Sequence, residues 1–170
     1  MPDTTILSLP EARALLRLSD ENAARDTLLT DVVLPGVDEL IESHVGAVVP
    51  RAHTFEVIRH GGASTILLPE PNVLSLTSGT LPNGDAVDVT SFVVEPGGVL
   101  RATVGHLPAG RWSLVAQVGR EPIPHGIKMA AGEVLALAWE TQRSQDPTPF
   151  LLPYRAEAWL APHTNGATFA

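Results

Sequence analysis

Trp112-Ser-Leu-Val-Ala-Gln-Val118 is followed by Gly-Arg-Glu-Pro-Ile-Pro124 and then by a segment rich in Ala and Leu. The first part is typical of a β-strand and the last part of a helix. Proline donates no ladder hydrogen bond and disfavours helix in the residue before it, so Pro122 and Pro124 end the strand and predict an extended linker. Because the residues before about 51 also have a helical pattern, the chain is predicted to be α+β, a helical core with an inserted antiparallel β region.

The length and composition predict one packed domain. The chain has 170 residues, of which 44% are hydrophobic, enough to bury a core without covalent cross-links. We expect a single domain over 1–170, helical in 8–46 and 123–161, with the β insertion at about 51–120 and a loose tail at 164–170. The chain has no cysteine, which excludes disulfides and Cys-based metal or nucleophilic chemistry. Its apolar runs are too short to span a bilayer, and we expect no membrane association.

The formal net charge of −8 at pH 7 argues against a dedicated nucleic-acid-binding protein. Phosphate binding gains its free energy from clustered Lys and Arg, and the basic residues of this chain are scattered. We therefore expect no sequence-specific binding of nucleic acid.

Two helices are predicted before the β region. Ser8-Leu-Pro-Glu11 is a capping-box pattern that starts a short helix. A longer amphipathic helix follows and ends near Gly46. Pro35 lies inside its apolar pattern and removes one backbone hydrogen bond, so we expect a kink around residues 31–35, or else a division of the helix.

The β region is predicted from short β-rich runs separated by Gly, Pro, Asn and Asp turns. This spacing is typical of an antiparallel meander or a small barrel. The predicted strands are 54–59, 65–68, 73–77, 87–94, 99–104 and 112–118.

The helix after Pro124 is predicted to have an apolar side along which several positions are small. Alanines and Gly132 on this helix allow another helix or a neighbouring subunit to approach closely. A last short helix is expected within 150–160. Of the tryptophans, Trp139 is assigned to the core, whereas Trp159 is evenly balanced between the core and an interface. The side of the long helix comprises Ile127, Ala131, Val134, Leu135, Ala138, Trp139 and Gln142.

No set of residues predicts a catalytic, cofactor or metal site. The six histidines include no His-Glu-x-x-His motif, and His53 and His60 are interpreted as ordinary strand and turn residues. The Gly pairs at 61–62 and 97–98 lack a phosphate-loop context, and Asp85 and Asp88 are interpreted as solvated. A chain with clear helix and turn signals but no convergent chemistry is better explained as an assembly component than as an enzyme.

The order of elements and four local patterns resemble the phage head-tail connector, or head-to-tail adaptor, proteins of long-tailed double-stranded DNA bacteriophages. Members share a short helix and then a longer one, and the strand that ends in Gly, then Pro, before a long helix. One departure is the Tyr-x-x-Gly strand end, which is Ala116-Gln-Val-Gly119 in this chain. Two further matching segments are Leu68-Pro-Glu-Pro-Asn-Val73 and Leu152-Pro-Tyr-Arg-Ala-Glu-Ala-Trp-Leu160.

The resemblance implies a non-enzymatic virion protein at the head-tail interface, which assembles in the host cytoplasm. It would form a ring of twelve copies under the portal protein, extend the DNA channel and hold the next neck or tail protein. It would need no cofactor. The candidate interface residues are Pro35, Pro122, Pro124 and Trp159.

Three alternatives stay open from the sequence. One is another neck component, a stopper or tail-completion protein, which predicts a β-barrel core with peripheral helices. Another is a small metal-dependent enzyme that uses His53, His60 and Asp85. The third is a carbohydrate- or protein-binding β module, although aromatic residues make up only 5% of the chain.

Overall fold

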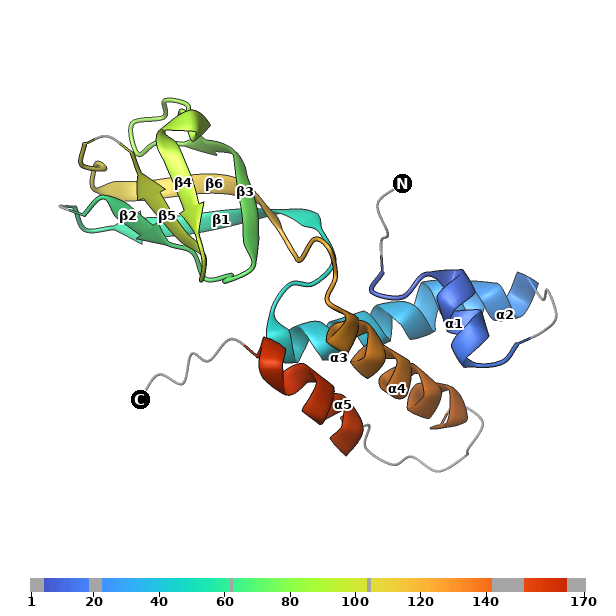
Figure 1. Cartoon of the computed structure of the whole chain (residues 1–170). Coiled ribbons are helices and arrows are strands. Elements are labelled where there is room, and N and C mark those ends of the chain that lie inside the picture. The colour runs from blue at the N-terminus through green and yellow to red at the C-terminus, as the bar shows by residue number, and fades with distance from the viewer. Residues whose placement is uncertain (1–4, 19–22, 62, 104, 142–151, 165–170) are drawn as a thin grey trace. The chain divides into compact units, whose positions relative to one another are not determined.

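The structure is a computed structural model that describes residues 5–18, 23–61, 63–103, 105–141 and 152–164. The chain forms two compact units. A helical unit comprises Met1–Val49 and Pro122–Ala170, and a β unit comprises Pro50–Glu121. The predicted α+β class with an inserted antiparallel β region is confirmed (Figure 1). Whether both units belong to a single domain stays a prediction.

The helical unit begins with α1 (Leu9–Leu15), which starts where the capping pattern predicts. The backbone N–H and the hydroxyl of Ser8 both donate to Glu11 Oε2, at 2.8 and 2.9 Å. The Glu11 carboxylate thus accepts hydrogen bonds from the residue just before the helix. A carboxylate is also favoured in the first turn of a helix, because the helix dipole is positive there.

A longer helical path follows: α2 (Ala23–Leu28), the π-helical segment η1 (Leu29–Val33) and α3 (Leu34–Val45). Pro35 lies in the first turn of α3, where the absence of its N–H costs little. The N–H of Leu34 donates to the carbonyl of Leu29, five residues back. The disturbance predicted at residues 31–35 therefore takes the form of a wide π turn directly before the proline.

The unit is completed by α4 (His125–Thr141), α5 (Tyr154–Leu160) and the short 3-10 helix η3 (Ala161–His163). Gly126 allows η3 to lie close to the start of α4, because a Cβ there would lie 2.8 Å from His163 Nε2 and 3.3 Å from the carbonyl of Trp159. The predicted last short helix is confirmed, while Gln142, residues 150–151 and the predicted tail from residue 165 lie outside the described residues.

The helices share one apolar core. The predicted side of α4 faces it, and Trp139 packs against it partly buried. Asp38 is buried at its edge, and its Oδ1 accepts the N–H of Ile6 at 3.1 Å, which holds the N-terminal segment on α3. The core is formed by Ile6, Leu7, Ala12, Leu29, Val33, Leu34, Val37, Ile41, Val45, Val48, Val49, Ile127, Ala130, Ala131, Val134, Leu135, Ala156 and Leu160.

The β unit has two three-stranded antiparallel sheets with the orders β1-β6-β3 and β2-β5-β4. The meander interpretation is wrong, because β2 pairs with β5 and β3 pairs with β6 instead of with the strands next to them in the sequence. The strands are β1 (Arg51–Arg59), β2 (Thr65–Leu67), β3 (Val73–Thr80), β4 (Phe92–Glu95), β5 (Val99–Ala102) and β6 (Gly110–Val118).

The predicted strand 87–94 is wrong in its first half. Asp88 Oδ1 accepts hydrogen bonds from the N–H and the hydroxyl of Thr90, at 3.0 and 2.7 Å. This local bonding closes the 3-10 turn η2 (Val89–Ser91) before β4 begins, as short polar side chains commonly do when they compete with a ladder.

The β unit has its own core, in which β6 alternates buried and partly buried residues with the period of two that a half-buried strand requires. Trp112 on β6 is fully buried, and its ring meets that of Phe92 on β4 edge to face, with centroids 6.4 Å apart. The two sheets therefore pack on each other through this pair.

Candidate functional site

The residues of the enzyme hypothesis do not form a site. His53 lies on β1 and His60 directly after it, and seven residues of extended strand separate them by on the order of 20 Å. Asp85 lies in the turn after β3, where Asn83 Nδ2 donates to its Oδ2 at 2.6 Å. Among the described residues, no group of three or more His, Asp and Glu could hold a metal ion.

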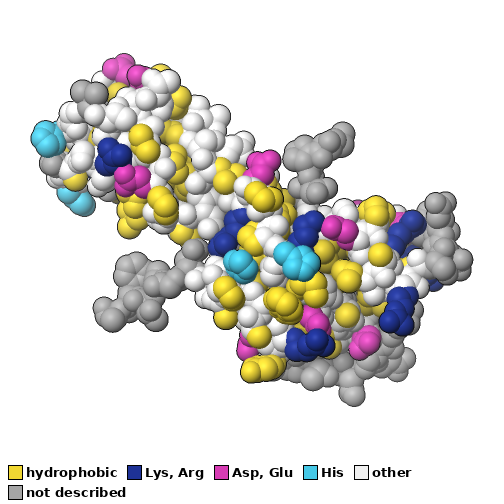
Figure 2. All heavy atoms as spheres, in the orientation of Figure 1, with side chains coloured by type: hydrophobic (Ala, Val, Ile, Leu, Met, Phe, Trp, Pro, Cys, Tyr) yellow, Lys and Arg dark blue, Asp and Glu magenta, His cyan; other side chains and the backbone are white. Residues whose placement is uncertain are grey.

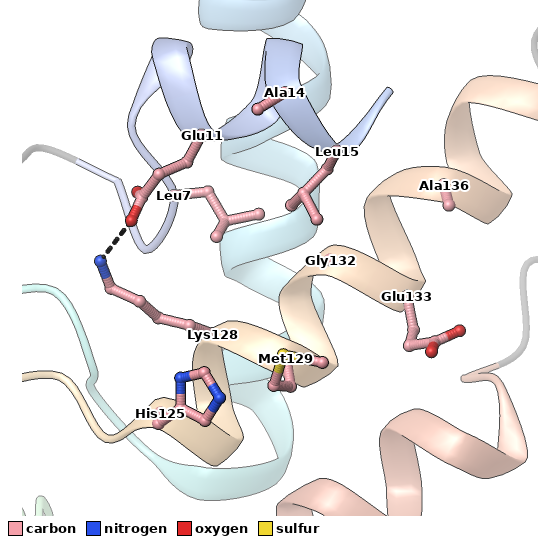
Figure 3. A pocket seen from close by; sticks show the side chains of 10 residues that line it. All are labelled: Leu7, Glu11, Ala14, Leu15, His125, Lys128, Met129, Gly132, Glu133 and Ala136. Atoms are coloured by element: carbon pink, nitrogen blue, oxygen red, sulfur yellow. Dashed lines mark hydrogen bonds and ion pairs between the residues drawn. The ribbon is translucent and has the colours of Figure 1, made fainter. Parts of the chain in front are cut away.

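A groove with a volume of about 500 Å³ lies between α1 and α4 of the helical unit. Figure 3 shows the side chains of α1 on one side and those of α4 on the other. Leu15 and Met129 are 51% and 36% exposed, so apolar side chains line a surface that water reaches. Around the groove lie Leu7, Glu11, Ala14, Leu15, His125, Lys128, Met129, Gly132, Glu133 and Ala136.

An ion pair joins the two walls of the groove at one end. Lys128 Nζ of α4 donates to Glu11 Oε1 of α1 at 2.9 Å (Figure 3). This hydrogen bond, together with the N–H of Ser8, lowers the pKa of Glu11 from its ordinary value. The carboxylate therefore stays ionised and keeps α1 attached to α4.

A glycine sets the depth of the groove at its centre. A Cβ on Gly132 would lie 3.3 Å from Leu15 Cδ1, so the glycine lets Leu15 rest on the backbone of α4. One turn further along α4, the side chain of Ala136 is only a methyl group. At this other end, Glu133 Oε1 lies 3.5 Å from Arg155 Nη1 of α5.

A second exposed apolar surface follows the path of α2, η1 and α3. Leu28 and Val32 are 39% and 56% exposed, and Gly36 is exposed one turn further on. We call these three residues, spaced four apart, the outer row; the exposed Pro35 lies beside it. Figure 2 shows hydrophobic side chains lying among charged ones on the visible face of the helical unit.

A contiguous exposed apolar surface is typical of a site that binds a protein, a membrane or a ligand. The groove contains Lys, Glu and His side chains, but these side chains either form an ion pair or lie at the rim of the groove. The arrangement suits the binding of a helix with a narrow apolar side.

The four candidate interface residues lie outside the groove. Pro35 borders the outer row, and Trp159 on α5 is 41% exposed. Pro122 is exposed, whereas Pro124 is partly buried and its carbonyl accepts the N–H groups of Ile127 and Lys128 at 3.0 and 3.2 Å. Pro124 thus fixes where α4 starts.

The groove itself was missed in the sequence, because its walls come from segments more than a hundred residues apart. One signal was present. The small residues of α4 predicted a close approach by another helix or subunit, and Gly132 and Ala136 now line the groove.

Comparisons with known proteins bear on the fold. Neither protein-family models nor curated protein sequences give a match. Among solved structures, a chain from the virion of a native gene transfer agent (GTA) particle is similar with a TM-score of 0.73 and 19% identity, over 94% of this chain and 90% of that one. The protein shares the fold of that chain.

Chains in two neck structures are also similar to this one. A chain in the neck of an empty GTA particle, computed with C6 symmetry, has a TM-score of 0.66 and 19% identity over 94% of this chain and 91% of that one. A chain in the neck of a native GTA particle, computed with C12 symmetry, has a TM-score of 0.64 and 20% identity over 94% and 91%. The coverage includes both units, so the insertion of a β unit into a helical unit is common to all of these chains. In the described part of this chain, no helix is long and apolar enough to cross a membrane.

Proposed function

We propose that the protein is a head-to-tail adaptor, a structural component of the neck of a phage-like particle. Twelve copies form a ring under the portal protein, extend the DNA channel and hold the next neck or tail protein. The observation that carries this proposal is the shared fold, over nine-tenths of both chains, with proteins in the necks of GTA particles computed with C6 and C12 symmetry.

The charge of the chain supports a conduit for DNA. A net charge of −8 gives passing DNA little to bind, because affinity for phosphate depends on clustered cations. A basic channel would slow the movement of DNA during packaging and ejection. The protein would be assembled in the host cytoplasm and then be part of the virion. It would have no catalytic activity.

The helical unit favours the adaptor over a stopper or tail-completion protein. A stopper-like protein is expected to have a β-barrel core with helices at its periphery. Here α1, α3, α4 and α5 enclose a core of their own. We propose that this helical core forms the body of the ring.

Interface roles for individual residues are part of the proposal. Pro35 and Trp159 are exposed on helices, and a large aromatic side chain in this position is the type that dominates binding free energies. Pro122 and Pro124 lie at the start of α4 and are proposed to hold the chain in the shape that docks.

The test is negative-stain imaging of the purified chain mixed with the portal protein of the same particle, beside each protein alone. The expected result is a ring bound directly to the portal. A stopper would instead leave the portal bare until a separate adaptor is added, and that result would refute the proposal. A Trp159→Ala variant should reduce ring binding, with Glu157→Ala on the same helix as the matched control.

A further inference from the structure

We infer that the outer row of one copy packs into the groove of the next copy, in an antiparallel orientation, and that this contact closes the ring. The inference rests on the proposed function, since it requires several copies. A closed ring of identical copies uses head-to-tail contacts, in which each copy presents two different surfaces that fit each other. The groove and the outer row are two such surfaces on the helical unit.

The outer row is short enough to lie within the groove. It extends from Leu28 to Gly36, eight residues or about 12 Å of helix. On α4 the lining residues run from His125 to Ala136, eleven residues or about 16 Å. The outer row therefore occupies the part of the groove from Met129 to Ala136 and leaves the end at His125 uncovered.

The side-chain sizes fit in one orientation only. With the helices antiparallel, Gly36 faces Met129, Val32 faces Gly132 beside Leu15, and Leu28 faces Ala136. Each pair sets a large side chain against a small one, which lets facing layers interdigitate without voids. In the parallel orientation, Leu28 would meet Met129 while Gly36 and Ala136 would leave a gap.

The charges select the same orientation. Glu39 is exposed on α3, one turn beyond Gly36, and in the antiparallel contact it reaches the end of the groove that holds His125 and Lys128. Lys128 already donates to Glu11, and its ammonium has further N–H donors for a second carboxylate. The parallel contact would instead bring Glu39 to the exposed Glu140, and two carboxylates repel each other.

Cysteine pairs test this contact, because the chain has no cysteine of its own. Rings on the portal are assembled from a mixture of two single variants, oxidised and separated by mass. The mixture of Leu28→Cys with Ala136→Cys, and that of Gly36→Cys with Met129→Cys, should give covalent dimers. The mixture of Leu28→Cys with Met129→Cys should give none, since disulfides need Cα atoms within about 7 Å. A Leu28→Cys/Ala136→Cys double variant should give a ladder of multimers.

A charge variant tests whether the contact matters for assembly. Val32→Arg should lower the yield of rings by about tenfold, which corresponds to the loss of one well-buried contact. The control is Leu67→Arg on β2, since Leu67 is similarly exposed, at 64%, but lies outside both surfaces. Both positions are open to solvent, and circular dichroism checks that the variants keep the fold.

Three outcomes overturn the inference. Rings that form without either predicted cross-link exclude the contact, as does cross-linking by a single variant alone, which would mean that identical surfaces meet. A cross-link of Ala136→Cys with Tyr154→Cys of α5 would place a different helix in the groove. If the unmodified chain forms no ring on the portal, the proposed function fails and takes this contact with it, whereas rings without the cross-links refute the contact alone.

Discussion

Replacing Trp112 by alanine should unfold or weaken the β unit and leave the helical unit intact. Trp112 is fully buried between the two sheets. Its indole N–H donates to the carbonyl of Pro108 at 3.2 Å, and its ring meets Phe92 edge to face. The core of the helical unit contains no residue of the β unit, so the damage should stay local.

The magnitude follows from the contacts that are lost. Truncation of a buried Trp to Ala costs about 3–5 kcal/mol through lost burial and the cavity that remains. This range already includes the loss of the indole hydrogen bond and of the contact with Phe92. Neither is added separately, because such contributions are not additive. We expect the free energy of opening of the β unit to fall by about 4 kcal/mol. Trp112→Phe keeps an aromatic ring and loses the N–H donor, so it should cost only about 1–2 kcal/mol.

Native-state hydrogen exchange, read by mass spectrometry, measures both units in one experiment. Amides of β1 and β6 should lose protection in Trp112→Ala, and to a smaller extent in Trp112→Phe. Amides of α3 and α4 should exchange as in the unmodified chain. An equal loss of protection in both units would instead mean that the helical core depends on the β core, contrary to this prediction. The same measurement decides whether the chain behaves as the single domain predicted from its length.

Three further substitutions test individual contacts. Asp38→Ala should destabilise the helical unit by about 2 kcal/mol, because the buried N–H of Ile6 loses its acceptor; thermal unfolding measures this, and Asp38→Asn should retain most of the stability. The pKa of Glu11 is lowered by Lys128, so the ion pair stabilises the fold at neutral pH and that stability is lost as the pH falls below 4.5. The side chains of Glu11 and Lys128 are 42% and 32% exposed, which limits the contribution of the ion pair to below about 1 kcal/mol. Urea titrations at several pH values should show a weaker dependence of the free energy of unfolding on pH in Lys128→Met. An unchanged pH dependence in that variant would contradict the role of Lys128. Arg59→Met should cost the β unit about 2–3 kcal/mol in urea unfolding, because the buried guanidinium donates to two loop carbonyls; a loss as small as that of an exposed arginine would refute this role.

Much of the fold could be predicted because its signals are local. The capping pattern at Ser8 starts α1, and the alternation on β6 and the prolines after it locate the last strand and α4. What failed was non-local or depended on a single side chain. The pairing of β1 with β6 joins strands about fifty residues apart, and the 3-10 turn in place of a strand depends on the carboxylate of Asp88.

The groove shows the same limit. The small residues of α4 indicated that something approaches that helix, but only the folded chain places Leu15 over Gly132 and joins Glu11 to Lys128. No spacing along the sequence relates α1 to α4. The candidate interface residues chosen from the sequence were conspicuous prolines and a tryptophan, whereas the outer row consists of ordinary Leu, Val and Gly whose exposure is a property of the packed helices.

Native mass spectrometry of the portal protein mixed with this chain measures whether the chain forms a ring directly on the portal, as proposed. We expect the complex to gain the mass of twelve chains of 18.0 kDa each, without any other neck protein present. A complex that gains no mass, or that gains it only after a separate adaptor has bound, would contradict the proposal.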